Sequence, residues 1–542
     1  MTVYQPQEIG VKWPEPLETT WQYLGGVASQ EIAPQLPHLG MGEILFMSTV
    51  MSIPRGDRPW GIVSWMSEVF EVSRPGLYDL TKRVQERLMP PSAPKQLSRP
   101  KTEAATVQVT ANRMARTVLQ ASLPGKTAIR PLRQVLGEAF DQRRSIGWIS
   151  ELLSTAGHQA GHILSQIDTS PLGTVIVARD ETFFQGQPLL LIIEPVSSTI
   201  VFAQVTPDRQ AETWATALLL AQDQGLTIGG LVEDMASMYA KSQVEAELEV
   251  AVQKDIWHIQ RDGAGVLRAL ERSAFRATRQ VLDLEKKLLK KWDDPLFTEK
   301  YIPAVDKEAL RYDQHDAFAQ WLVHLIDALE MVDWRSGEIR ERDINAWLLD
   351  ETLAAMSLID HPAVLKWVKT LRRHQAQLLT ALDWLETSLV PFRQHLAAHL
   401  APDHHRPFMR IVARHWRLNQ ALINGHASFS RLAQQAHEAL RFLIADDLKL
   451  HPLAQALLAL FDAAARTSSM IENVNGLLKQ FLYTHQAFRN PDTLQLYLNL
   501  FVLWHNTRVF ERGKRQGRSP YQIAGIDPGS DDWLDLLGFP AC

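Results

Sequence analysis

The spacing of apolar residues changes twice along the chain. Up to about residue 173 they recur every three or four positions, which is typical of amphipathic helices. Between residues 174 and 261, short runs rich in β-branched residues, such as TVIVARDET and STIVFAQV, indicate strands. Long helical patterns such as DAFAQWLVHLIDALEMV then fill residues 262–465. The pattern predicts an α/β segment that follows helical modules and precedes a large all-helical block.

Within the α/β segment, the order of elements predicts a mixed sheet. TVIVARDET is followed by PLLLIIEP and STIVFAQV, two runs that flank VSS and predict a hairpin. AETWATALLLAQDQGL predicts a helix that ends at Gly225, and TIGGLVED predicts the fourth strand. SMYAKSQVEAELEVA predicts a further helix, and VQKDIWHIQ predicts the fifth strand. Because the last strands alternate with helices, we expect them to run parallel in a five-stranded sheet.

Residues 1–88 form a predicted N-terminal helical region with a helix-turn-helix. GIVSWMSEVF and LYDLTKRVQERL each have the helical period, and EVSRPG separates them. Ser73 is a suitable N-cap, and Pro75 falls in the first turn of the second helix. Any helical hairpin would show the same pattern, so DNA binding is one of two interpretations. Its candidate DNA-binding residues are Arg74, Tyr78, Lys82 and Arg83.

A predicted linker and a second helical module follow. Residues 89–108 are rich in Pro, Ser and Lys, and residues 109–170 predict helices that break near Arg143 and at Ala156–Gly157. Residues 91–150 hold ten Lys and Arg against three Asp and Glu, and residues 501–520 hold five against one. Basic surfaces of this kind either contact phosphate or are simply solvated. The candidate phosphate contacts here are Arg143, Arg144, Arg512, Lys514 and Arg515.

Composition and length limit the number of domains and the compartment. A chain of 542 residues is too long for a single hydrophobic core, so we expect several domains. A net charge of −5 neither favours nor opposes a nucleic-acid partner. The single cysteine, Cys542, excludes a disulfide framework and a zinc site built on several thiolates. No signal-peptide pattern and no apolar run of about 20 residues is present. We therefore expect a soluble cytoplasmic protein, associated with the nucleoid when it is bound to DNA.

Two acids stand where predicted strands end. Asp180 closes the first strand and Asp234 closes the fourth. In a sheet with ribonuclease H topology these strands are neighbours, so the two carboxylates would converge. Two like charges placed together are costly unless a cation lies between them, and Mg²⁺ prefers such oxygen ligands. Two ions in such a site support phosphodiester chemistry. The alternative is that both are turn-forming Asp residues.

Five segments together resemble the DDE-type transposases of bacterial insertion sequences, whose catalytic domain is RNase H-like. ARDETFF and GLVEDMASMYAKS resemble the segments that carry the first and second Asp of that family. DIWH resembles its (Cys/Asp)-x-x-His signature, and RTSSMIENVNGLLKQF resembles its acidic helix. NLFVLWHNTRVFERGKRQGRSPYQIAGI resembles the C-terminal tail of many members. The resemblance covers residues 174–261 and 462–526. It implies that Asp180, Asp234 and Glu472 are catalytic residues and metal ligands, with Asp255 and His258 as auxiliary residues.

The resemblance also implies a domain arrangement. Residues 171–261 and 466–542 would form an α/β, RNase H-like core with a mixed five-stranded sheet, and residues 262–465 would be an all-helical insertion. Asp234 and Glu472 lie 238 positions apart, which exceeds the spacing in compact members of the family. The insertion must therefore leave and return at nearly the same place, so we expect Arg261 and Arg466 to be close in space.

Several neighbouring residues leave alternatives open. Glu181 and Glu233 compete with the adjacent Asp residues, but alternation along a strand lets only one of each pair face the ions. On a strand, Asp255 and His258 would point to opposite faces. His258 would then either lie near the active edge, touching phosphate or orienting Asp234, or be a core histidine.

The resemblance implies a function as well. It implies Mg²⁺-dependent cleavage at the ends of a mobile element, with Mn²⁺ as a possible substitute, and transfer of the freed 3′-OH into target DNA. The implied partners are double-stranded DNA, both terminal inverted repeats and target, and further copies of the chain in a synaptic complex. A nuclease that cuts without joining strands, or a domesticated DNA-binding protein without activity, are the alternatives.

The helical block adds two minor candidates. A basic surface is expected around LKWVKTLRRH, where Lys366, Lys369, Arg372 and Arg373 have helical spacing. An aromatic residue in the block could stack on a displaced base, although tryptophans at helical spacing usually belong to a core. The tryptophans concerned are Trp321, Trp334, Trp347, Trp367, Trp384 and Trp416.

Overall fold

The structure is a computed structural model that divides into two compact units, residues 1–108 and 109–542, each described here by itself. No helix among the described residues is long and apolar enough to cross a membrane. The described residues are 38–54, 58–59, 61–88, 108–290, 295–423, 425–447, 449–464, 469–485, 488 and 490–541.

The first unit is a small bundle with its own core. Both helices predicted between residues 59 and 88 are present, and a third helix that the sequence pattern did not predict packs with them. Met47, Met66 and Leu77 are buried between the three helices. The predicted linker lies outside the described residues, except for Gln108. The helices are α3 Met41–Ser52, α4 Ile62–Val69 and α5 Arg74–Leu88.

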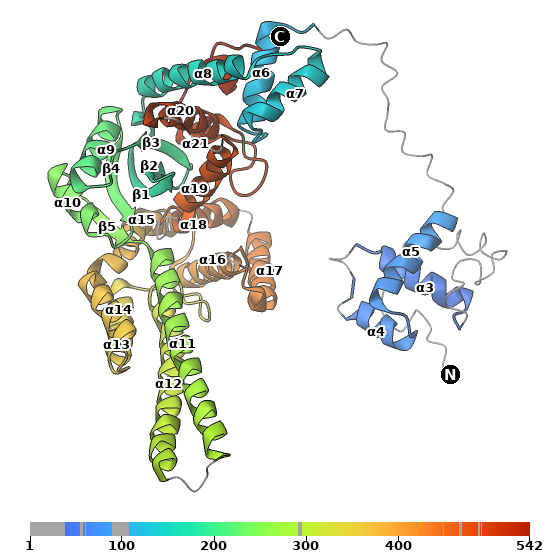
Figure 1. The fold of residues 1–542 in the computed structure, drawn as a ribbon, viewed down its shortest axis with the longest axis vertical. Coiled ribbons are helices and arrows are strands. Elements are labelled where there is room, and N and C mark those ends of the chain that lie inside the picture. Colours follow the sequence, from blue (N-terminus) through green and yellow to red (C-terminus); the bar gives the residue numbers. More distant parts are fainter. Residues whose placement is uncertain are drawn as a thin grey trace. The chain divides into compact units, whose positions relative to one another are not determined.

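The second unit is built around a five-stranded mixed sheet (Figure 1). Its strand order is β3-β2-β1-β4-β5, in which β1–β2 and β2–β3 are antiparallel and β1–β4 and β4–β5 are parallel. The predicted mixed sheet is therefore confirmed, and strands one and four are neighbours. The strands are β1 Thr174–Phe184, β2 Gln187–Glu194, β3 Thr199–Val205, β4 Thr227–Glu233 and β5 Ala251–Lys254.

Helices cover both faces of this sheet. On one face, α9 (Ala211–Asp223) and α10 (Ser237–Glu245) pack through Trp214 and Tyr239. On the other face, α8, α19 and α20 share a core with alternate residues of β2. Because β2 is buried on both sides, it is a nearly continuous apolar run rather than an alternating one. The three helices are α8 Ile146–Gln166, α19 Ser469–Leu482 and α20 Pro491–Thr507.

The helices that precede the sheet belong to the same core. α6 (Ala111–Ser122), α7 (Ile129–Phe140) and α8 join the apolar cluster on the α20 side of the sheet. The predicted break near Arg143 is present, but the break predicted at Ala156–Gly157 is wrong, because α8 continues through it. A Cβ atom at Gly157 would lie 2.6 Å from the backbone oxygen of Leu496 in α20. This glycine therefore permits close helix packing and does not end the helix.

Residues 262–465 are helical in their described parts, apart from connecting loops and an isolated bridge between Val332 and Ile339. The block has its own large apolar core, and α11 and α12 form a long antiparallel hairpin (Figure 1). Its helices are α11 Ile256–Leu288, α12 Pro295–Ala328, α13 Arg342–Ser357, α14 Pro362–Arg373, α15 Thr380–Ala397, α16 Pro402–Ile423, α17 Ser430–Asp446 and α18 Leu450–Ala463.

The helical block is fastened to the edge of the sheet at β5. The buried amide of Gln253 donates to the backbone oxygen of Leu378 (3.1 Å) and accepts from the backbone nitrogen of Ala381 (2.7 Å). Trp384 of α15 lies on β4, where a Cβ at Gly230 would be 2.5 Å from its ring. The block therefore packs on β5 and on the face of β4 that carries Gly230 and Val232.

Candidate active site

Asp180 lies inside β1, which continues to Phe184, so the prediction that it closes this strand is wrong. Its side chain faces α19. The Oδ2 atom of Asp180 accepts a hydrogen bond of 3.0 Å from Nδ2 of Asn475, a buried residue of α19. The neighbouring Glu181 points to the opposite side of the sheet, where it accepts from the Tyr239 hydroxyl (2.6 Å) and pairs with Arg209. Strand alternation thus separates the two acids, and Asp180 is the one on the α19 side.

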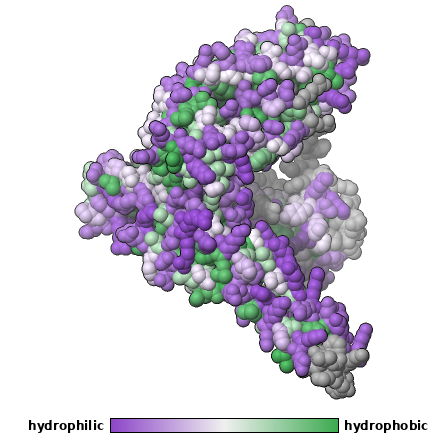
Figure 2. Space-filling view, turned by 60° about the vertical axis from the view of Figure 1, so that its left-hand side comes forward, coloured by the Kyte–Doolittle hydropathy of each residue, from purple (hydrophilic) through white to green (hydrophobic). Residues whose placement is uncertain are grey.

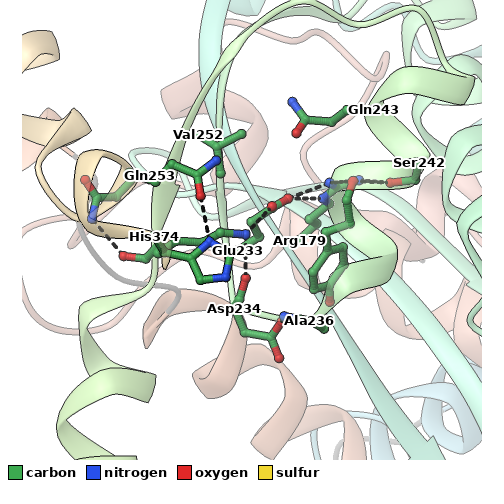
Figure 3. A network of polar contacts seen from close by, with 12 residues as sticks. Arg179, Glu233, Asp234, Ala236, Ser242, Gln243, Val252, Gln253 and His374 are labelled. Atoms are coloured by element: carbon green, nitrogen blue, oxygen red, sulfur yellow. Dashed lines mark hydrogen bonds and ion pairs between the residues drawn. The ribbon is translucent and has the colours of Figure 1, made fainter. Parts of the chain in front are cut away.

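Asp234 follows the last residue of β4. Its Oδ1 accepts from the backbone nitrogen of Ala236 (2.7 Å), which fixes the turn into α10. The competing acid, Glu233, is buried and bound by Arg179 and Lys254, as Figure 3 shows for the arginine. Glu233 is therefore engaged on the other side of the sheet, and Asp234 keeps an oxygen for a ligand.

Arg179, Glu233 and Lys254 form a buried ionic network on the face of the sheet opposite Asp180. Arg179 donates from Nε to Glu233 (2.7 Å), from Nη1 to Ser242 (2.8 Å) and from Nη2 to the Tyr239 carbonyl (2.9 Å) (Figure 3). Lys254 donates to Glu233 (2.7 Å) and to the carbonyl of Asp234 (2.9 Å). Buried charges persist when they are paired and hydrogen-bonded in this way.

Each of the three charged residues in the network directly precedes one of the predicted site acids. Arg179 precedes Asp180, Glu233 precedes Asp234, and Lys254 precedes Asp255. For the two strand pairs, period-two alternation places the network on one face and turns the next side chain to the other. The motif analysis missed this network. Its signal in the sequence is a charged residue followed by Asp at the end of three apolar runs, in ARD, VED and QKD.

Asp255 and His258 correct the prediction of a long fifth strand. β5 ends at Lys254, and Asp255 caps α11 by accepting from the backbone nitrogen of Trp257 (2.8 Å). The first turn of a helix brings residues three apart together, so His258 Nδ1 lies 2.5 Å from Asp255 Oδ2. The two side chains therefore meet instead of pointing to opposite faces.

Glu472 completes the group from the first turn of α19. Its Oε1 lies 3.7 Å from Nε2 of His258, whose other ring nitrogen is held by Asp255. The start of the helical block and the helix that follows it thus meet side by side. His258 lies three residues before Arg261, one of the two expected junctions. Arg466, the other expected junction, lies outside the described residues.

The electrostatics tie these residues into one site. Burial raises the pKa of Asp180 to about 8, and the negative charges of Glu181, Glu472 and Asp234 raise it as well, while His258 partly offsets them. Burial lowers the pKa of His258, but the hydrogen bond and charge of Asp255 raise it above its ordinary value. A carboxylate with a pKa raised by other carboxylates is a position where a bound cation would be stabilising.

The donor set suits a hard divalent cation that keeps part of its water shell. In the described part of the chain, no group of three or more His, Cys, Asp or Glu side chains is arranged so that it could hold a metal ion alone. Mg²⁺ commonly uses one or two carboxylates and completes its shell with water and substrate phosphate. Asn475 Oδ1 is also buried at this site without a hydrogen-bond partner. Asp180 and Asp234, which the parallel pairing of β1 and β4 places level with each other, are the carboxylates that could share such an ion with a phosphate ligand.

The predicted DNA-binding residues fall into two groups. Arg74, Tyr78, Lys82 and Arg83 are exposed on α5, and Arg143 and Arg512 are exposed on loops. Arg74 of this group donates to the Ser64 hydroxyl (2.7 Å). Among the remaining residues, Arg144 lies over the Trp148 ring, Lys514 pairs with Asp462 (2.6 Å), and Arg515 donates to the carbonyls of Pro195 and Val196. Burial lowers the pKa of Arg515. Lys514 and Arg515 thus hold the loop after α20 to the protein.

The tryptophans of the helical block mostly belong to cores. Trp367 and Trp416 are buried, and Trp321, Trp334 and Trp384 pack against apolar clusters, whereas Trp347 is 63% exposed. The basic residues expected on α14 are exposed, namely Lys366, Lys369, Arg372 and Arg373.

Comparison with known proteins gives distant structural likenesses. No family model and no curated protein matches the chain. Among solved structures, the chain is similar to the Drosophila P element transposase strand transfer complex, at 12% sequence identity and a TM-score of 0.27. The match covers 68% of this chain and 95% of that one. Because the TM-score is this low, evidence for a function comes from the residues of this chain and not from the similarity.

Proposed function

We propose that the chain is a DNA transposase of the DDE type, with an RNase H-like catalytic core and a helical insertion, of the kind found in bacterial insertion sequences. One observation carries the proposal. Parallel pairing of Ala178 with Val232 puts Asp180 and Asp234 level on neighbouring strands, and α19, which carries Glu472, contacts Asp180 through Asn475 (3.0 Å). Glu472 nevertheless lies 238 residues beyond Asp234 in sequence. A structural role would not require acids at this sheet corner, since burial and the neighbouring negative charges raise the pKa of Asp180.

The chain's own residues have distinct roles in this proposal. Asp180 and Asp234 would hold Mg²⁺ or Mn²⁺, and Glu472 would hold a second ion or orient water. When bound, such ions activate a water or 3′-OH nucleophile and neutralise charge on the scissile phosphate. Asn475 keeps the Asp180 carboxylate in place, and Asp255 fixes the ring of His258 so that Nε2 faces Glu472. Asn475, Asp255 and His258 act as positioning residues.

The metal ligands can be tested by charge-neutral substitution. We expect Asp180→Asn, Asp234→Asn and Glu472→Gln each to reduce DNA cleavage by about a hundredfold or more, since each removes an ion ligand. Binding to the same DNA should be retained. The substrate is a supercoiled plasmid that carries the inverted repeats flanking the coding sequence in its genome. Normal cleavage by Asp234→Asn would show that this acid is not a ligand.

Strand joining distinguishes a transposase from a nuclease. A pre-cleaved end with a free 3′-OH is incubated with target plasmid, the full-length protein and Mg²⁺. A transposase joins the end to the target, whereas a nuclease leaves both unlinked. Cleavage without any joined product would favour the nuclease, and neither product would favour a DNA-binding protein without activity. The α5 face and exposed loop arginines are the proposed sites for recognition of the ends.

A further inference from the structure

One face of α11 carries a line of basic and aromatic side chains that begins at the active site. At 3.6 residues per turn, these residues lie within about 60° of one line along the helix. His258, which faces Glu472, is in the first turn of the same helix. The α11 stripe, as it is called below, consists of Trp257, Arg261, Arg268, Arg272, Phe275, Arg279, Leu282 and Lys286.

The stripe is exposed and its central arginines have no partners. Arg268, Arg272 and Arg279 form no ion pair or hydrogen bond with any described residue, and each is exposed. Phe275 stands among them with 55% of its surface exposed. Arg272, Phe275, Arg276, Thr278, Arg279 and Leu282 line an open recess of about 460 Å³. Of these side chains, Thr278 contacts the Tyr312 hydroxyl of α12 (3.2 Å), and the other five are exposed.

The hairpin partner does not neutralise the stripe. α11 carries seven basic and four acidic side chains, whereas α12 carries three basic and six acidic ones. Such opposite charge would favour ion pairs between the helices, yet none joins described residues of α11 and α12. Glu271 and Asp283 lie at the borders of the stripe, and Asp283 pairs with Lys286 (3.8 Å), not with the central arginines. The arginines are therefore turned to solvent, where a polyanion can reach them. Figure 2 shows the hairpin end of this unit as largely hydrophilic with isolated hydrophobic patches.

We propose that the α11 stripe binds the backbone of duplex DNA and guides the strand from the tip of the hairpin to the catalytic acids. This proposal deepens the proposed function by naming the surface that holds the DNA beside the site. Arginines four residues apart are separated by about 6 Å along a helix, which corresponds to a rise of about two base pairs along the axis of a duplex. Arg and exposed aromatic side chains suit phosphate and sugar contacts, respectively.

The length and starting point of the stripe favour DNA over an acidic protein segment. α11 has 33 residues, which at 1.5 Å each span about 50 Å, or about 15 base pairs of duplex. Its first turn contacts Glu472 through His258, so a strand that follows the stripe reaches the proposed metal site without a bend in the protein. An acidic protein segment would explain the charge but not this continuity.

Salt-dependent binding tests the charges. Full-length Arg272→Ala/Arg279→Ala and Arg431→Ala/Arg441→Ala proteins are compared by fluorescence anisotropy, with a labelled random-sequence duplex and EDTA. Arg431 and Arg441 are exposed, unpaired residues of α17, so the two variants lose equal charge from the same helical block. We expect the stripe variant to lose about 1.8 from the slope of log affinity against log salt, and at least about tenfold in affinity near 0.1 M salt. The control should match the wild type.

Site-directed cross-linking tests the location. Because the chain has one cysteine, Cys542→Ser gives a background without thiols in which Leu282→Cys or Val323→Cys carries a photo-cross-linker. Leu282 is in the stripe, and Val323 is a more exposed position on α12. We expect DNA cross-links from position 282 in excess over position 323.

Three results would overturn the inference: an unchanged salt slope in the stripe variant, equal or stronger cross-linking from position 323, or displacement of the DNA by an equal concentration of polyglutamate. Binding is measured in EDTA and does not depend on catalysis. An inactive site with intact stripe binding would therefore contradict the proposed function alone, and Asp180→Asn should leave the salt slope unchanged.

Discussion

At the scale of single residues, the environment of Asp180 disfavours the ionised form of its carboxyl group. Its pKa of about 8 in the folded protein exceeds the ordinary carboxyl value of 3.8, so the folded state keeps a proton that the unfolded state has lost. The contribution of Asp180 to stability is therefore greatest at low pH and declines as pH rises from about 4 to about 8. A bound divalent cation would remove this decline by favouring the ionised form.

This pH dependence gives a prediction for Asp180→Asn. Without divalent ions, the variant should gain stability relative to the wild type as pH rises from 5 to 8, because its side chain cannot ionise. Urea unfolding at both pH values measures the difference, and comparison with wild type cancels the other titrating groups. Mg²⁺ should raise the stability of the wild type more than that of the variant. If the difference in unfolding free energy between variant and wild type is equal at both pH values, the pKa of Asp180 is not raised in the folded protein.

The residues of the site were predictable to different degrees. Asp180 and Asp234 stand out because an acid at the end of an apolar run has few structural reasons to be there. Glu472 was found through resemblance alone, because its partners are far away in sequence. Asn475 and Lys254 were given no role, since an amide in a helix or a lysine in a strand is ordinary until its tertiary partner is known.

At the scale of elements, local chemistry overrode two patterns. The apolar run of VQKDIWHIQ predicts a strand, but Asp255 is a good N-cap and the helix starts directly after it. Ala156–Gly157 predicts a break, but the missing Cβ is used for packing against α20. In both cases the deciding factor is a contact made at the residue, which hydrophobic periodicity does not include.

Gly157 therefore gives a prediction about the contact between α8 and α20. Gly157→Ala places a Cβ 2.6 Å from the Leu496 carbonyl oxygen, so the helices must separate. We expect a loss of about 1–3 kcal/mol in unfolding free energy, the usual cost of overpacking. The matched control is Gly137→Ala in α7, where a Cβ meets nothing within 4 Å. It should stabilise the protein by about 0.5–1 kcal/mol, because alanine is the better helix former.

Chemical denaturation of both variants measures the difference in sign. If both glycines respond alike, α8 and α20 do not pack as closely as the structure has them. The same comparison separates helix propensity, which is common to the two sites, from packing, which is present only at Gly157.

At the scale of the whole chain, segments that are far apart in sequence share one hydrophobic core. The sequence pattern groups residues 109–170 as a module separate from the sheet, yet Leu119, Leu153 and Ala160 are buried in the same cluster as β2 and α20. The pattern does identify helices and strands, because each element's own period reveals its buried face. It does not show which buried faces meet, since that depends on contacts hundreds of residues apart.

This distinction decides which N-terminal fragment can be used to test the predicted DNA binding. A fragment of residues 1–108 keeps the whole core of α3, α4 and α5. A fragment of residues 1–165 would remove α20 and the sheet from α8 and expose its apolar face to water, which favours aggregation. We expect the shorter fragment to be monomeric and the longer one to bind a hydrophobic dye and self-associate.

The shorter fragment then tests recognition by α5. We expect residues 1–108 to bind duplex DNA containing the element's end with an affinity that falls steeply as salt rises. Arg83 is exposed on α5 and has no partner among the described residues, so Arg83→Ala should weaken binding without loss of fold. A matched control is Glu68→Ala, which removes an exposed acid from α4. Gel shifts with the two variants and the parent fragment decide the matter. If the fragment fails to bind while the full chain binds, recognition of the ends belongs to the second unit, and the α11 stripe becomes the first surface to examine.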